Sequence, residues 1–121
     1  MGLDMNAFIT ETDIAEVDFA FPKDSLEIAY WRKHPNLHGW MEELYRDKGG
    51  SAATFNCVNL RLDATDIDAL ELVVLADVLP LTTGFFFGES TAEDKNADLA
   101  FIAKARELLA QGKAVFYSAW W

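Results

Sequence analysis

The side chains best suited to chemistry lie close together between residues 32 and 38. Arg32, Lys33 and His34 are consecutive, and His38 follows His34 by four residues. The group holds two of the ten Lys and Arg residues and both histidines of the 121-residue chain. Guanidinium and ammonium groups bind phosphate and carboxylate groups through charge-assisted hydrogen bonds. This basic cluster therefore indicates an anion-binding or partner-binding site in an otherwise acidic chain.

Pro35 places the cluster at a junction between two predicted helices. Asp24 and Glu27 have the spacing of a capping box, which predicts a helix that ends near Lys33. Proline is accepted in the first turn of a helix, so a second helix begins at Pro35. Positive side chains suit the C-terminus of the first helix, and the free N–H groups that open the second attract anions. We expect a phosphate or carboxylate to bind between Arg32 and those N–H groups.

A structural role is the alternative explanation for the same residues. In that case Arg32 and Lys33 only stabilise the end of the first helix and pair with nearby acids such as Glu27. Trp31 and His38 would then be buried and hydrogen-bonded at the corner between the helices. The two explanations differ in whether the basic side chains share an open cavity.

The other candidate residues indicate neither a metal site nor a catalytic pair. His34 and His38 have the spacing of metal ligands on one helix face, but Pro35 interrupts that geometry and no third ligand follows. The clustered acids have the spacing of helix starts, where negative charge suits the helix dipole. These acids are Asp63, Asp66, Asp68 and Glu71, and Glu93, Asp94 and Asp98. The Gly-x-Ser-x-Gly motif of one class of serine hydrolases is missing, so the catalytic residues stay unassigned.

The periodicity of the apolar residues predicts a single α+β domain that spans residues 1–121. Short alternating segments predict strands, and longer apolar stripes with capping residues predict helices. Their order is typical of a mainly antiparallel sheet packed against about four helices. The predicted strands are 3–10, 15–21, 55–62 and 114–120, and the predicted helices are 24–33, 35 to the glycine pair 49–50, 63 to Pro80, and 91–111.

Capping residues and glycines mark the helix ends. Thr65 with Asp68, and Ser90 with Glu93, have the spacing of capping boxes. Gly112 stands where a helix end adopts a left-handed conformation. The nearly continuous apolar run from 70 to 78 predicts a central helix that is buried on most of its sides.

The single cysteine and the phenylalanine run are expected in the core. Cys57 lies in an apolar segment and has no partner for a disulfide, so we expect a small buried side chain. Residues 84–88 form Gly-Phe-Phe-Phe-Gly, which lacks the Lys and hydroxyl of a phosphate-binding loop. Core burial is the expectation for these rings, and an exposed ring would form an apolar patch for a partner.

The composition is that of an acidic domain with ample material for a core. Hydrophobic residues make up 51% of the chain, which excludes a disordered protein. The net charge of −10 opposes direct binding to nucleic acid and favours either solubility or contact of an acidic face with a basic groove on another protein. No apolar run is long enough to cross a bilayer, and the first residues lack the pattern of a signal peptide, so we expect a cytoplasmic protein.

Four segments form a recognisable set: Met-Gly-Leu-Asp-Met at 1–5, Tyr-Trp-Arg-Lys at 30–33 with Leu37, His38 and Trp40, Leu-Pro and Thr-Gly-Phe-Phe-Phe-Gly within 79–88, and Tyr-Ser-Ala-Trp at 117–120. Together they resemble a small protein family that is carried by bacteriophages and prophages. The family's biochemical role is unassigned, and some members are labelled phosphoglycerate kinase, although this chain is too short for a two-domain kinase and has no nucleotide loop. Many relatives have Tyr in place of Asn6 and an acidic, cysteine-bearing insert in place of residues 49–53.

The resemblance implies that Asp4, Trp31, Arg32, Lys33 and His38 form the ligand-binding or partner-binding site. Small size, acidity and the phage resemblance favour a phage-derived accessory protein of the bacterial cytoplasm. It would bind a host protein or protein complex and modulate it, for example as a defence-system inhibitor of the anti-CRISPR type. The alternative is a small enzyme or ligand-binding domain that recognises a phosphate-bearing molecule through Arg32, Lys33 and His38. Neither hypothesis calls for a cofactor, a metal or a membrane.

Overall fold

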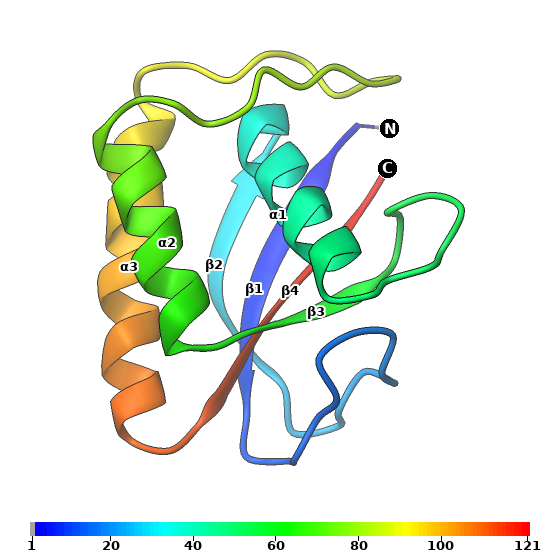
Figure 1. The fold of residues 1–121 in the computed structure, drawn as a ribbon, viewed down its shortest axis with the longest axis vertical. Coiled ribbons are helices and arrows are strands. Elements are labelled where there is room, and N and C mark those ends of the chain that lie inside the picture. Colours follow the sequence, from blue (N-terminus) through cyan, green and yellow to red (C-terminus); the bar gives the residue numbers. More distant parts are fainter. Residues whose placement is uncertain (1) are drawn as a thin grey trace.

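The computed structural model describes residues 2–121 and contains one antiparallel sheet covered by helices (Figure 1). Met1, the first residue of the Met-Gly-Leu-Asp-Met segment, lies outside the described residues. The strands are β1 (Asp4–Thr10), β2 (Leu26–Arg32), β3 (Asn59–Leu62) and β4 (Ala114–Trp120), and the helices are α1 (Pro35–Asp47), α2 (Ala64–Leu75) and α3 (Asp94–Ala110). The predicted α+β class is confirmed, with three helices in the described residues instead of about four.

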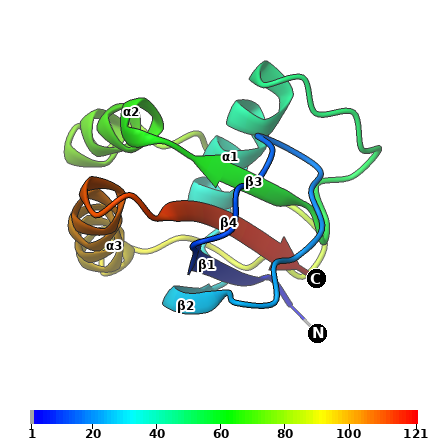
Figure 2. The same cartoon turned by 90° about the horizontal axis from the view of Figure 1, so that it is seen from below.

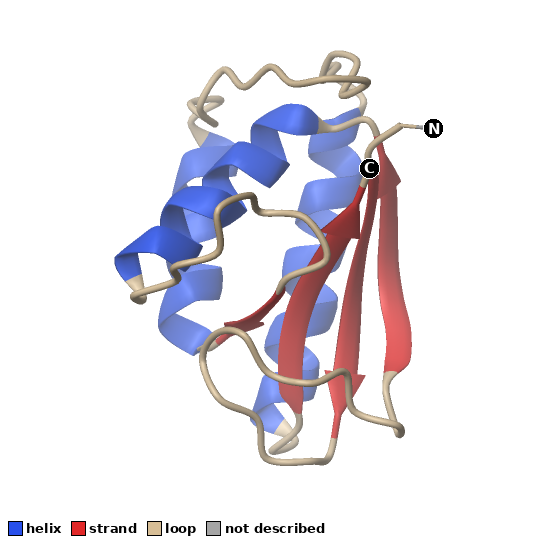
Figure 3. Ribbon diagram, turned by 90° about the vertical axis from the view of Figure 1, so that its right-hand side faces the viewer, coloured by secondary structure: helices blue, strands red, loops and turns tan. Residues whose placement is uncertain are grey.

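The sheet has the order β2-β1-β4-β3, and all neighbouring strands are antiparallel. Figure 3 shows the three helices on one side of it, and Figure 2 shows α2 and α3 packed side by side. β2 forms one edge, and its register with β1 shifts between Ala7 and Phe8. The last strand and the first therefore lie together in the middle of the sheet, although they are far apart in the sequence.

The helix predicted for residues 24–33 is wrong, because this segment forms strand β2. Its residues pair with β1, so that Arg32 lies opposite Asp4. Asp24 does not cap a helix. Its carboxylate accepts hydrogen bonds from the hydroxyl groups of Thr10 and Thr12 and ties the start of β2 to the end of β1. The local capping pattern was overridden by strand pairing, as is common for short segments with mixed propensity.

The strand predicted for residues 15–21 is reduced to a single bridge between Val17 and Leu60 at the outer edge of β3. Asp18 has a φ of 56°, a left-handed conformation that a regular strand does not allow. Its carboxylate accepts a hydrogen bond of 2.8 Å from the hydroxyl of Tyr45 on α1. The segment thus crosses the sheet edge irregularly and does not add a fifth regular strand.

Most of the other predicted elements are present with shifted ends. α1 begins at Pro35 as expected, and Gly112 has the left-handed φ of 84° expected after α3. β3 begins at Asn59, four residues later than predicted, because Cys57 has a φ of 59° and interrupts the strand. The capping box of α2 is formed by Asp63 and Asp66 and not by the predicted pair at 65 and 68.

The main core lies between the sheet and the helices. Met5, Leu60 and Tyr117 from the strands are fully buried there against residues such as Met41 and Ile102 from the helices. The opposite face of the sheet carries a smaller aromatic cluster, in which Phe8 stacks on Phe116 with ring centroids 5.2 Å apart. The remaining rings of this cluster are Phe19 and Phe21, from the segment between β1 and β2.

Helix α2 is much more exposed than predicted. Only Asp66, Ile67, Leu70 and Val74 are buried among its residues. Leu72 is 71% exposed and Leu75 is 53% exposed. The apolar run was expected to be buried on most sides, but α2 has a neighbour, α3, on one flank and the core beneath it. Its outer face is therefore apolar and open.

Two further burial predictions need correction. Cys57 is exposed, because its left-handed backbone turns it away from the core. In the phenylalanine run only Phe87 is buried, whereas Phe85 is 75% exposed. The core prediction therefore holds for one of the three rings.

A long connection from α2 to α3 passes over the end of the sheet where both chain ends lie (Figure 1). It is held to α1 at Thr82, whose backbone N–H donates a 3.0 Å hydrogen bond to Oδ1 of Asn36. Gly39 makes this approach feasible, since a Cβ at that position would stand 1.9 Å from Oγ1 of Thr82. None of the helices in residues 2–121 is long and apolar enough to cross a membrane.

Candidate functional site at one end of the sheet

The segments that carry the family resemblance meet at this end of the sheet. Asp4 in β1 pairs with Arg32 in β2 and with Trp120 in β4. The backbone N–H of Lys33 donates a 2.8 Å hydrogen bond to the carbonyl of Leu3. Residues that are distant in sequence thus form one contiguous region, which we call the strand-end region. It comprises residues 2–4, 30–34, 87–90 and 117–121.

Asp4, Tyr30 and Arg32 form an exposed polar cluster. Oδ1 of Asp4 accepts hydrogen bonds from the Tyr30 hydroxyl at 2.7 Å and from Arg32 at 2.8 Å. The Tyr30 hydrogen bond, followed by the contact with Arg32, holds the pKa of Asp4 below its usual value. The positive charge of Arg32 is therefore partly neutralised by Asp4. All three residues lie on strands, Asp4 on β1 and the other two on β2.

Lys33 is held between two glycines of the motif segments. It has a φ of 56°, and a Cβ on Gly2 would stand 2.9 Å from its Cε. A Cβ on Gly88 would stand 3.0 Å from its Cβ and Cδ. The aliphatic part of the side chain therefore packs on backbone that only glycine leaves open. This contact explains why glycine is needed at both Gly2 and Gly88.

Trp31 points to the other side of β2 and is buried. Its Nε1 donates a 3.1 Å hydrogen bond to Oδ1 of Asp98 in α3. Its ring packs edge-on against Phe101, with centroids 5.1 Å apart. Trp31 thus joins the strand-end region to α3.

The other oxygen of Asp98 binds His34. Oδ2 lies 2.9 Å from Nε2 of His34, and both residues are almost completely buried. Nδ1 of His34 lies 2.6 Å from Oγ of Ser90, which also accepts a 3.0 Å hydrogen bond from the backbone N–H of Asn36. Ser90 was predicted to cap α3, but its hydroxyl faces α1 instead, and the N-cap position is taken by Glu93.

His38 lies in a separate, aromatic environment. Its Nδ1 is 2.7 Å from the hydroxyl of Tyr117, and the rings of Phe55, Phe87 and Trp121 surround it. Burial lowers the pKa of His38 to about 4, which the backbone of Phe55 opposes only in part. Its Nε2 is buried and has no hydrogen-bond partner of normal geometry in the described residues. His38 is therefore neutral at pH 7.

The structure thus separates the five residues that were predicted as one site. Asp4 and Arg32 are together at the surface, and Lys33 packs beside them. Trp31 and His38 are buried in two different places. The predicted anion site between two helix ends is not built, because Arg32 lies on a strand and the N–H of Asn36 already binds Ser90.

Two hollows lie near this region. One has a volume of about 450 Å³ and is lined by His34, Ser90, Val74 and Leu79, among others. The other, of about 780 Å³, is a groove between α1, α2 and residues 80–82. No sequence pattern indicated either, because their walls come from segments that are brought together only by the fold. The sequence feature that came nearest to indicating the smaller hollow was the position of Ser90 and Asp98 beside the start of α3.

Comparison of the chain with known protein families, curated proteins and solved structures gives no match.

Proposed function

We propose that this protein is a phage-derived accessory protein that binds a basic, apolar segment of a host protein and thereby modulates it. Inhibition of a bacterial defence complex, as anti-CRISPR proteins do, is the specific form of this proposal. The groove between α1 and α2 is the observation that carries it. The acidity of the chain and the resemblance of four segments to a phage-borne family support it further.

The floor of the groove is apolar. Trp40 and Leu44 line it from α1, Ala69 lines it from α2, and Leu81 closes it from the connection to α3. Leu81 is almost fully exposed, and Trp40 and Leu44 are only partly buried. Leu72 follows Ala69 by one helical turn and extends the apolar surface along α2. Such a contiguous apolar surface favours a partner over water.

The rim of the groove is acidic. Glu42, Glu43 and Asp47 line its α1 side. The one cationic side chain among the lining residues, Arg46, donates to the carbonyl of Ala52 at 2.6 Å and pairs with Glu42 at 3.4 Å. This pairing leaves the charges of Glu43 and Asp47 uncompensated among the lining residues. The rim therefore has an unbalanced negative charge. A partner that complements this charge carries Lys or Arg beside apolar residues.

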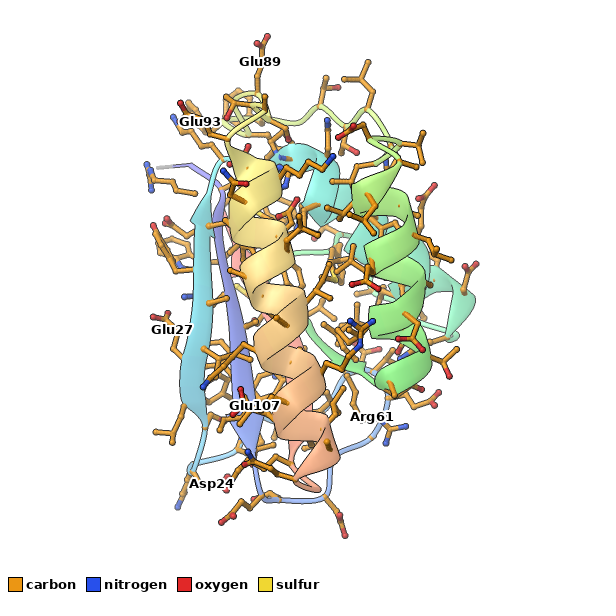
Figure 4. The ribbon with its side chains drawn as sticks, turned by 90° about the vertical axis from the view of Figure 1, so that its left-hand side faces the viewer. Asp24, Glu27, Arg61, Glu89, Glu93 and Glu107 are labelled. Atoms are coloured by element: carbon orange, nitrogen blue, oxygen red, sulfur yellow. The ribbon has the colours of Figure 1, made fainter. Side chains whose placement is uncertain are left out.

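A charge reversal on the rim tests this proposal. Glu43→Lys combined with Asp47→Lys should weaken binding to the host partner at least about tenfold, because it places like charges at the contact. Glu107→Lys is the matched control, since Glu107 is exposed on α3, well away from α1 (Figure 4). The partner is first recovered from host lysate with the wild-type protein as bait, by its elution with salt, and is then purified. Its affinity for the three proteins is measured by calorimetry at two salt concentrations.

The second measurement is plaque formation on bacterial cells. Expression of the wild-type protein in a host with a defence nuclease complex should restore plaque formation by a targeted phage. The rim variant should lose this effect and the Glu107→Lys variant should keep it. If the rim variant binds and protects as well as the wild type, the groove is not the binding surface. If the wild type protects no phage against any defence complex, the anti-defence role is wrong.

A further inference from the structure

We propose that Ser90, His34 and Asp98 form a nucleophilic site that hydrolyses small, uncharged carboxylic esters. This site lies apart from the acidic groove and does not depend on the binding function proposed above. Of the predicted basic cluster only His34 takes part in it, and the aromatic surroundings of His38 do not. It uses a buried histidine and a buried carboxylate that the binding function leaves unexplained.

The three side chains are connected in one line. Nε2 of His34 lies 2.9 Å from Asp98, and Nδ1 lies 2.6 Å from Oγ of Ser90. Asp98 accepts from Nε1 of Trp31 with its other oxygen. The proposed site requires that Nε2 of His34 donates to Asp98, because a carboxylate only accepts. The lone pair of Nδ1 is left to accept the hydroxyl proton of Ser90.

The groups around Ser90 also favour transfer of its hydroxyl proton to Nδ1 of His34. The N–H of Asn36 donates to Oγ at 3.0 Å, so the hydroxyl proton is free to point at His34. Oδ2 of Asp94 lies 3.4 Å from Nδ1 of His34. This second carboxylate stabilises the positive charge that His34 acquires when it takes the proton. A base oriented by one carboxylate and hydrogen-bonded to a hydroxyl is the usual arrangement for activating a serine.

The hollow of about 450 Å³ gives a substrate access to the serine. Ser90 is partly exposed in it, whereas His34 and Asp98 are shielded from water. Val74, Leu79 and Ala92 supply apolar lining, and Lys95 at its wall is paired with Asp77 at 3.1 Å. Asp94 and Asp98 line the hollow as well, so its wall is net negative. This charge repels an anionic acyl group, and an uncharged one fits. The backbone N–H groups of Ser90 and Ala92, two residues that line the hollow, donate no hydrogen bond within the described residues, and the proposal assigns them to the oxyanion.

The proposed reaction is ordinary acyl transfer. Oγ of Ser90 attacks the ester carbonyl carbon while its proton moves to Nδ1 of His34. The tetrahedral intermediate collapses, the bond to the alcohol oxygen breaks, and His34 gives the proton to the leaving alcohol. A water molecule then attacks the acyl-Ser90 ester and gives a proton to His34. The acid is released and Ser90 recovers its proton.

A fluorophosphonate probe tests the nucleophile on the whole chain. Oγ of Ser90 forms a bond to phosphorus, fluoride leaves, and the adduct is located by peptide mass spectrometry. We expect a single adduct on Ser90, formed with a saturable rate. Ser90→Ala should abolish it, and Ser51→Ala, at an exposed serine after α1, should leave it unchanged. No adduct on Ser90 in the folded protein, or equal labelling of Ser51, would overturn the proposal.

Asp98→Asn tests the positioning role of the carboxylate. The amide forces the opposite tautomer on His34, which then has no lone pair for Ser90. The maximal labelling rate should fall about 100-fold or more, with the half-saturating probe concentration unchanged. Hydrolysis of p-nitrophenyl acetate is compared in a Cys57→Ala background, because the exposed thiol reacts with this ester itself. Unchanged labelling in a folded Asp98→Asn variant would rule out His34 as the base.

Discussion

Nε1 of Trp31 lies 3.1 Å from Oδ1 of Asp98, a residue 67 positions further along the chain. The same carboxylate holds His34 through its other oxygen. One buried acid therefore joins strand β2, the start of α1 and helix α3. This carboxylate therefore connects the strand-end region to helix α3.

Removal of the indole donor should destabilise the protein measurably. Trp31→Phe keeps an aromatic ring against Phe101 but leaves one oxygen of the buried Asp98 unpaired. We expect the free energy of unfolding to fall by about 1–3 kcal/mol, from urea denaturation. Tyr30→Phe is the matched comparison, since it removes a hydrogen bond to the exposed Asp4, and should cost clearly less. Equal losses of unfolding free energy in the two variants would show that the burial of Asp98 does not strengthen its hydrogen bond to Trp31.

The neutral His38 should make stability depend on pH. Its pKa falls from 6.5 to about 4 on folding, so the unfolded chain binds the extra proton between these values. The stability that this group contributes is complete above pH 6.5 and is lost as the pH falls towards 4, at up to about 1.4 kcal/mol per pH unit. The double variant His38→Phe, Tyr117→Phe removes the group and its partner together. The difference in unfolding free energy between the two proteins, measured from pH 7 to 4, should follow this slope.

A methyl group at Gly39 should displace the connection after α2. Gly39→Ala would put a Cβ 1.9 Å from Oγ1 of Thr82, and a clash in such a packed contact costs about 1–3 kcal/mol. Because Thr82 and Leu81 form one wall of the acidic groove, partner affinity should fall as well. Adding Thr82→Gly removes the clashing atoms and should restore much of the stability. A Gly39→Ala variant as stable as the wild type would contradict the close approach.

The outer face of α2 should tolerate charge. Leu72→Lys alters an exposed side chain and should change the free energy of unfolding by less than about 0.5 kcal/mol. Leu70→Ala, two positions earlier but fully buried, should cost about 2–5 kcal/mol. Thermal unfolding of both variants compares the two faces directly. Partner affinity of the Leu72→Lys protein then shows whether the open face extends the groove.

Local sequence patterns predicted those elements correctly whose tertiary contacts favour the same secondary structure. The proline at the start of α1 and the glycine after α3 marked helix ends that the structure has, and the strand predicted for residues 114–120 is β4. The α+β class is also as predicted. Residues 26–32 failed because a capping pattern at Asp24 and Glu27 is also compatible with a strand. Pairing with β1 decided between the two, and a single sequence contains no direct sign of such pairing.

The candidate sites were harder to predict for the same reason. Trp31 was among the predicted site residues, but its hydrogen-bond partner Asp98 had been grouped with the acids of a helix start. Ser90, His34 and Asp98 come from three segments, and no short motif joins them. The exposure of Leu72 depends on how many neighbours a helix has, which its own periodicity does not reveal.

The position of β2 at the sheet edge affects how readily the protein aggregates at high concentration. An edge strand offers a row of free N–H and C=O groups on which a second chain can add, the first step towards cross-β stacking. Here the register shift between Ala7 and Phe8 bends the edge, and Arg32 places a charged side chain at its end. A second copy therefore finds no flat, uncharged template along β2, which protects this edge of the sheet against fibrillar growth.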